Sequence, residues 1–234
     1  MNHQQWLDFA EHEYALFLSL LRSLGPDEWQ APTDCAGWSV RDIVAHVAGA
    51  AQSTASFRET ARQMLLARRH EGAQLIDRIN EVQLADRRHA SPAELLTELE
   101  SAASSSVRAR RRLPAPLRLL PVPTDTPGLG TTRLGFLNDT VYTRDVWMHR
   151  VDISRATGRT LVLTGAHDGA LVADAATAWL AHPGSPAGVV LTGPAGGRFG
   201  AVDPGSLTFD GIDFCRALAG RGVLTGVRSD LVPF

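Results

Sequence analysis

Four polar side chains fall on the apolar face of one long predicted helix, which spans residues 133–157. At about 100° per residue, all four lie within about 40° of the centre of the stripe that a helical bundle buries. They are Asn138, Asp145, His149 and Asp152. Burying an ionised carboxylate without a partner costs several kcal/mol or more, so the fold has to supply a positive charge or protonate the acid.

The source of that positive charge is restricted, because the chain contains no lysine and all 23 of its basic residues are arginines. The same absence excludes Schiff-base catalysis and a phosphate-loop lysine. Two interpretations of the helix stay open. An Asp–Arg or Asp–His pair can neutralise the acids inside the bundle, or a divalent metal can be bound by Asp145 and His149, which lie one turn apart.

A third metal ligand is available on an earlier predicted helix, spanning residues 40–57, where Ser39 and Asp42 form an acidic variant of a capping box. His46 lies roughly 120° from the centre of its buried stripe. Such a flank position is typical of a surface histidine, but it can also face the cleft between helices where bundles hold metals. The other histidines are predicted to face solvent: His3, His12, His70, His89, His167 and His182.

Charge and cysteine content narrow the classes of partner. The formal net charge of −2 gives no reason to expect nucleic acid or an anionic membrane. No apolar run approaches the ~20 residues needed to cross a bilayer, and no signal sequence for export is recognised. Cys35 and Cys215 lie far apart and match no zinc or redox spacing, so we expect a reduced, cytoplasmic compartment.

The pattern of elements predicts two domains, residues 1–158 and residues 159–234. Apolar periodicity predicts helices in the first domain over residues 4–24, 40–57, up to 88 with a break near 72, 92–112 and 133–157. Residues 114–130 are predicted to form a long loop, and the arginines at 108–112 a solvated helix end. The second domain is predicted to contain helices at 166–180 and 210–220 and strands at 188–192, 198–202 and 207–209.

The segment from Pro32 to Val47, PTDCAGWSVRDIVAHV, resembles the signature of the mycothiol-dependent maleylpyruvate isomerase family, within the DinB/YfiT-like metalloenzyme superfamily. The later DVWMHRVD, at residues 145–152, and the closing VPF are similar to members of this family. The resemblance covers nearly the whole chain. It implies an α+β protein with an N-terminal DinB-like four-helix bundle followed by a small sterol-carrier-like α/β domain.

The resemblance also implies a ligand set. In that family a histidine of the second helix, with an acid and a histidine four residues apart on the last bundle helix, holds a divalent metal, often zinc. These roles map onto His46, Asp145 and His149, with aspartate here where the isomerase has glutamate. Asp152 is expected to accept a hydrogen bond from His149 and fix its tautomer. Asn80 and Gln83 are expected either to line a substrate pocket or to make hydrogen bonds between helices.

The function implied is that of a cytoplasmic metalloenzyme with a low-molecular-weight thiol, mycothiol, as co-substrate. A thiol activated at the metal would add to an electrophilic small molecule, in a cis–trans isomerisation or an S-transfer. Asp145 is assigned as a ligand, so no residue is assigned as general base. Two alternatives stay open: a non-catalytic metal- or small-molecule-binding protein of the DinB-like fold, and a bundle whose polar triad is purely structural.

Overall fold

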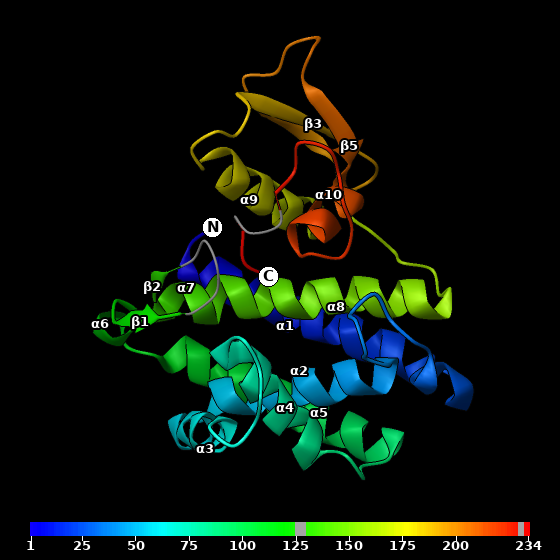
Figure 1. The fold of residues 1–234 in the computed structure, drawn as a ribbon, viewed down its shortest axis with the longest axis vertical. Helices are drawn as coiled ribbons and strands as arrows, with labels where there is room; N and C mark the ends of the chain where they lie inside the picture. Colours follow the sequence, from blue (N-terminus) through cyan, green and yellow to red (C-terminus); the bar gives the residue numbers. More distant parts are fainter. Residues whose placement is uncertain (125–129, 229–231) are drawn as a thin grey trace. The chain divides into compact units, whose positions relative to one another are not determined.

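The computed structural model describes residues 1–124, 130–228 and 232–234, and the chain divides into two compact units after Arg159 (Figure 1). The first unit is predominantly helical, and in the second, which begins at Thr160, helices accompany a three-stranded sheet. The predicted α+β class, a helical bundle followed by a small α/β unit, is confirmed.

Four helices form the bundle of the first unit: α1 (His3–Arg22), α2 (Val40–Ala55), α5 (Pro92–Arg112) and α8 (Tyr142–Thr157). Helices α1 and α2 each pack against both α5 and α8. Their facing apolar stripes make one continuous core, which includes Phe17, Ile43, Leu99 and Val146. Burial of such side chains stabilises the fold by about 1.5–3 kcal/mol each, so the core holds α2 against α8.

Capping side chains begin two of these helices where the sequence predicts. Ser39 and Asp42 form a capping box at the start of α2, and Ser91 and Glu94 form one at the start of α5. Each box satisfies backbone N–H groups that the first turn of a helix leaves without partners. The bundle ends on Gly158, whose φ of +67° terminates α8 in the left-handed region.

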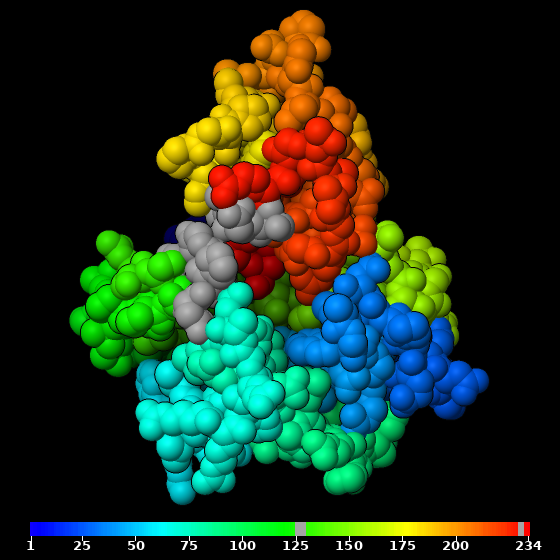
Figure 2. Space-filling model, in the orientation of Figure 1, coloured from blue at the N-terminus to red at the C-terminus, as the bar shows by residue number. Residues whose placement is uncertain are grey.

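Shorter elements flank the bundle. A 3₁₀ turn, η1 (Pro26–Gln30), follows α1, and the predicted helical stretch up to residue 88 forms two helices, α3 (Phe57–Ala67) and α4 (Leu75–Asp86). Helix α4 packs against α2 and α3. In the space-filling view the cyan segment that carries α3 and α4 forms part of the surface (Figure 2). Because α4 packs against α2, side chains of α4 can contact residues of α2.

The prediction of a structureless loop over residues 114–130 is wrong for the part that the structure describes. This stretch contains α6 (Ala115–Arg118) and strand β1 (Pro121–Pro123), which pairs antiparallel with β2 (Thr131–Arg133). The prolines indicate a loop by composition, yet Pro114 and Pro116 fall at the start of a helix, where a proline costs no hydrogen bond. Residues 125–129 of the predicted loop lie outside the described residues.

The long helix predicted over residues 133–157 is interrupted. It divides into α7 (Leu134–Phe136), a π-helical turn, η2 (Leu137–Val141), and α8. A π-turn contains more than 3.6 residues, so a phase of 100° per residue does not carry across it. Asn138, predicted to lie on the buried face, is therefore only half-buried, whereas Asp139 and Thr140 are buried.

The second unit contains α9 (Asp168–Leu180), β3 (Gly188–Thr192), β4 (Gly197–Gly200), β5 (Leu207–Asp210) and α10 (Gly211–Leu218). Strand β3 is central, antiparallel to β4 and parallel to β5. The two helices pack together against the sheet, with the rings of Trp179 and Phe214 5.2 Å apart. The three strands match the predicted segments to within two residues.

Three predictions of exposure are wrong. Arg110, predicted to lie in a solvated helix end, is 1% exposed, and its Nη2 donates to the Asp139 carbonyl and the Thr143 hydroxyl. His167 is buried, and its backbone N–H donates to Thr164 Oγ1 in the turn that begins α9. The ring of His3 is largely covered and pairs with Asp139. His70 and His182 are half-buried, and His12 and His89 are exposed.

No helix among the described residues is both long enough and apolar enough to cross a membrane.

A buried ion pair joins α1 to α8, since Arg150 Nε and Nη2 donate to the two carboxylate oxygens of Glu13 at 2.6 and 3.1 Å. We expect Glu13→Ala to lower the free energy of unfolding by about 3–5 kcal/mol, because it removes the carboxylate that both Nε and Nη2 of the buried Arg150 guanidinium contact. Urea denaturation measures this. The double variant Glu13→Met/Arg150→Met is the control and loses much less. A Glu13→Ala protein as stable as the wild type would contradict the assignment.

Candidate metal centre

Three side chains from two bundle helices converge at one point. His46 lies on α2, and Asp145 and His149 lie on α8. The Nε2 atoms of His46 and His149 lie 3.3 Å from Asp145 Oδ2 and Oδ1, respectively. One ligand atom of each residue lies within 4.8 Å of the others, the spacing of a group that can hold a metal ion. Their side chains are 8%, 18% and 4% exposed, so Asp145 is the most accessible.

A chain of amides fixes which nitrogen of His46 carries hydrogen. The Gly49 carbonyl can only accept, so the Gln63 amide donates to it at 3.0 Å and turns its oxygen toward Gln83. Gln83 Nε2 donates to that oxygen at 2.9 Å, and Gln83 Oε1 accepts from His46 Nδ1 at 2.8 Å. With its proton on Nδ1, the neutral His46 ring directs the lone pair of Nε2 at Asp145.

A carboxylate and a thiol perform the same task for His149. Asp152 Oδ2 lies 3.0 Å from His149 Nδ1, and Asp152 is fully buried. The same oxygen accepts from the Cys35 thiol at 3.3 Å. An imidazole that donates from Nδ1 to a buried carboxylate is oriented with Nε2 available as a metal ligand. His149 Nε2 faces the remaining oxygen of Asp145.

These two networks produce an electrostatic requirement. Each neutral imidazole presents a lone pair to a carboxylate oxygen at 3.3 Å. The nitrogen and the oxygen are then both hydrogen-bond acceptors, so a cation has to lie between them. A proton or a metal ion meets this need. Burial by itself would raise the pKa of Asp145, but the positive charge of a protonated His149 outweighs it and holds that pKa well below its usual range.

Without a metal, the proton resides on His149. Burial opposes its charge, but the Asp145 carboxylate, with hydrogen bonds to Asp145, Asp152 and Cys35, raises the pKa of His149 well above the ordinary value of 6.5. The centre is therefore a carboxylate paired with an imidazolium through neutral pH. A divalent cation can replace that proton, and a donor set of two imidazole nitrogens and one carboxylate oxygen fits zinc and similar metals.

An aromatic side chain covers the two imidazoles. The ring of Trp38 lies 5.2 Å from that of His46 and 6.2 Å from that of His149, centroid to centroid. Trp38 belongs to a loop before α2 that is closed by hydrogen bonds, with the Thr33 N–H and hydroxyl both donating to the Trp38 carbonyl. The loop thus places an apolar wall and the Cys35 thiol beside the same centre.

The remaining residues singled out in the sequence lie on α4 or in the π-turn. Gln83 contacts His46 and Gln63 through the two ends of its amide. Asn80 lies one turn earlier, and its buried Oδ1 has no hydrogen-bond partner among the described residues. Asn138, in the π-turn, is half-buried. The sequence analysis missed Cys35, Trp38 and Gln63, although the first two lie within the segment that carries the family signature.

A four-helix bundle with two histidines and a carboxylate converging inside it defines a class of candidate metal-binding bundle proteins. Residues 10–154 match the profile described as the mycothiol maleylpyruvate isomerase N-terminal domain. This match spans more than half of the 234 residues, so the chain belongs to that family. All the residues of the candidate centre lie within the matched segment.

Solved structures with a similar fold extend beyond that domain. The crystal structure of the mycothiol-dependent maleylpyruvate isomerase matches with a TM-score of 0.60 and 20% sequence identity, covering 100% of this chain and 98% of that one. A histidine-to-alanine mutant of the same isomerase matches with the same values. At this identity the likeness shows a shared fold over both units. No curated protein matches this chain in sequence.

The amide chain behind His46 depends on a glycine, because a Cβ at Gly49 would lie 2.5 Å from Gln83 Cγ. We expect Gly49→Ala to displace Gln83 and weaken zinc binding by about tenfold or more, as loss of a residue that orients a ligand does. Competition against a chromogenic chelator measures the affinity. Gln83→Leu, which removes the amide at little cost to α4, should have the same effect.

Gly222→Ala is the matched control, since a Cβ there meets nothing within 4 Å. Unchanged zinc affinity in folded Gly49→Ala and Gln83→Leu proteins would show that the amide chain does not orient His46.

Metal affinity should depend on pH through His149. Because its pKa is raised, His149 is protonated at neutral pH without a metal, and binding must release that proton. We therefore expect zinc affinity measured between pH 6 and 8 to rise with pH, by about tenfold per unit wherever His149 is protonated in the metal-free protein, after correction for the buffer. Asp145 does not contribute, because its lowered pKa keeps it ionised in this range.

The metal-free protein should become less stable as pH rises, whereas its zinc affinity increases. The raised pKa of His149 contributes stability that is fully present below the ordinary imidazole value of 6.5 and is lost as pH rises through the raised pKa. Zinc titrations between pH 6 and 8 measure the affinity, and thermal melts of chelator-treated protein over the same pH range measure the stability. An affinity independent of pH would contradict a protonated His149.

Proposed function

We propose that this protein is a divalent-metal-dependent enzyme that uses a low-molecular-weight thiol, mycothiol, to add to an electrophilic small molecule. The observation that carries this proposal is the convergence of two imidazole nitrogens and one carboxylate, with both imidazole tautomers set by buried partners. A triad that served only to stabilise the bundle would need one acid–base pair. Here two oriented lone pairs and a carboxylate point at the same position.

We assign His46, Asp145 and His149 as the metal ligands, and zinc as the metal. Three protein ligands leave a coordination position for a substrate, as in catalytic rather than structural zinc sites. A bound divalent cation stabilises the thiolate form of a thiol and so supplies a nucleophile near neutral pH. The ligand set has one negative charge, from Asp145, so it leaves a net positive charge to attract that thiolate.

Other residues position the ligands and shape the site. Gln83 holds His46, and Asp152 holds His149, each through the Nδ1 atom. Trp38 covers the imidazoles and limits the access of water on its side. The unpartnered amide oxygen of Asn80 is on α4, one turn from Gln83, and we assign it to contact the substrate.

The reaction follows from thiolate addition. If the second substrate is a cis enedione acid, the sulfur adds to the double bond, the resulting single bond rotates, and elimination of the sulfur gives the trans isomer. If the substrate bears a leaving group or an epoxide, the sulfur instead displaces the leaving group or breaks the epoxide C–O bond, and the product is an S-conjugate. The names of the family and of the similar crystal structures favour isomerisation with mycothiol. A thiol-dependent reaction of this kind suits a reduced, cytoplasmic compartment.

Thiol and metal assays on the full-length protein test the proposal. We expect about one equivalent of zinc per chain, and mycothiol-dependent isomerisation of maleylpyruvate or consumption of mycothiol with an electrophile. His149→Ala should lose the metal and at least about 10³-fold of the activity, because the ligand and its charge network are both removed. His89→Ala, which changes an exposed histidine, is the matched control and should keep both.

Two outcomes would contradict the proposal differently. Bound zinc without turnover over a broad panel of electrophiles would support a non-catalytic metal-binding protein. Absence of zinc, or zinc retained in the His46→Ala and His149→Ala proteins, would show that the triad is structural.

A further inference from the structure

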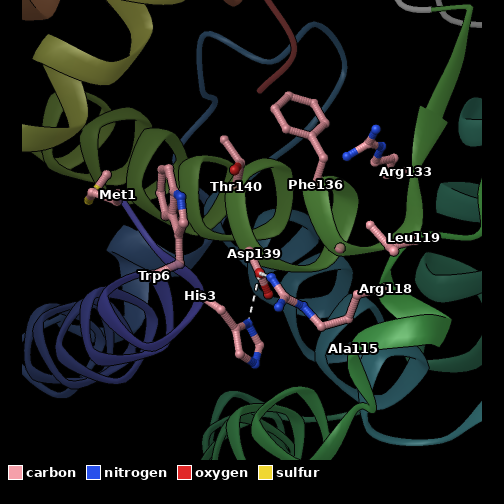
Figure 3. Close-up of a pocket in the computed structure, with 11 residues that line it drawn as sticks. Met1, His3, Trp6, Ala115, Arg118, Leu119, Arg133, Phe136, Asp139 and Thr140 are labelled. Carbon is pink, nitrogen blue, oxygen red and sulfur yellow. Dashed lines mark hydrogen bonds and ion pairs between the residues drawn. The ribbon is translucent and has the colours of Figure 1, made fainter.

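A pocket lies in the first unit, among the beginning of α1, helix α6 and the segment from β2 to the π-turn (Figure 3). Its volume is about 320 Å³, within the range of small-molecule sites. None of the three residues assigned as metal ligands lines it. It therefore offers a binding site separate from the candidate metal centre.

A buried carboxylate organises one wall of this pocket. Asp139, from the π-turn, is 5% exposed, and its Oδ2 lies 2.6 Å from Arg118 Nη2 and 2.8 Å from His3 Nδ1. Figure 3 shows these three side chains together. Gly135 lets the Arg118 backbone lie close to the segment before the π-turn, because a Cβ at residue 135 would lie 3.0 Å from the Arg118 carbonyl oxygen. These two contacts hold α1 and α6 against the π-turn and give the wall a defined shape.

Positive charge exceeds negative charge at this pocket. The negative charge of Asp139 is already matched by Arg118, and the lining also includes Arg133. No hydrogen bond or ion pair within the described ranges engages the Arg133 guanidinium. The Arg118 Nε–H is also buried and has no hydrogen-bond partner among the described residues. An unsatisfied buried donor of this kind indicates that the wall can still accept an anion.

Apart from Thr140, the rest of the lining is apolar or aromatic. Trp6 and Phe136 present their rings, and Leu119 lies between Arg133 and Arg118 in the close-up (Figure 3). Inorganic phosphate would leave these surfaces in water, whereas a ligand with an apolar body would cover them. Guanidinium groups match the planar geometry of a carboxylate.

We propose that the pocket of Trp6, Arg118, Arg133 and Phe136 binds a small organic carboxylate with an apolar body. The carboxylate pairs with Arg133, the body packs against the rings of Trp6 and Phe136, and the Arg118–Asp139–His3 cluster keeps the wall in place. This site does not depend on the metal or on the thiol reaction.

Sodium benzoate is the probe, titrated into the full-length protein by calorimetry with a chelator present, so that no carboxylate can bind a metal ion. We expect a dissociation constant on the order of 1 mM, as befits so small a ligand. Arg133→Gln should weaken binding by about tenfold or more, because it removes a charge-assisted hydrogen bond. Arg133 is exposed and joins no ion pair within the described ranges, so this variant should fold normally.

Matched controls separate this site from general attraction to arginine. Arg69→Gln changes another exposed arginine that does not line the pocket, and it should leave benzoate binding unchanged. Benzamide, which is neutral but similar in shape, should bind at least tenfold more weakly than benzoate. Absence of benzoate binding, equal binding by Arg133→Gln, or tighter binding of inorganic phosphate would each overturn the proposal.

Discussion

Between α2 and α8, the Nε2 atoms of His46 and His149 each lie 3.3 Å from one oxygen of the Asp145 carboxylate. Both kinds of atom are hydrogen-bond acceptors when the imidazoles are neutral, so the arrangement is stable only with a positive charge between them. The bundle core brings the two helices together, and the chain has no lysine that could supply the charge. Two buried arginines of the bundle are engaged with other groups, since Arg150 pairs with Glu13 and Arg110 contacts Asp139 and Thr143. A proton on His149 fills the position without a metal, and under the proposed function a divalent cation would replace that proton.

The parts that orient the ligands extend well beyond the two ligand helices. His46 is held from α4 through Gln83, which Gln63 of α3 supports in turn, whereas His149 is held from within α8 by Asp152 and from the loop before α2 by Cys35. Each imidazole thus depends on a separate part of the first unit. This explains why the site needs most of the bundle unit to form, and all of these parts lie inside the segment that matches the family profile.

Local patterns in the sequence were sufficient for the helix boundaries at Ser39 and Ser91 and for the phase of α8, because both depend on residues within a few positions of each other. The π-turn at residues 137–141 could not be found in this way, since nothing in its composition marks the additional residue. Cys35 was missed for a different reason. It lies in a loop, and only tertiary packing brings its thiol to Asp152, 117 positions away. Helical phase did place Gln83 on the right face, but the identity of its partner across the helices is not a local property.

X-ray absorption spectroscopy of the zinc-loaded protein tests the central claim most directly. The spectrum should show two imidazole nitrogens at about 2.0–2.1 Å with oxygen completing the shell, and no sulfur in the absence of added thiol. His46→Ala should reduce the imidazole contribution from two to one or abolish binding. A zinc site with a protein cysteine as ligand, or one with fewer than two histidines in the wild type, would contradict the ligand set of His46, Asp145 and His149.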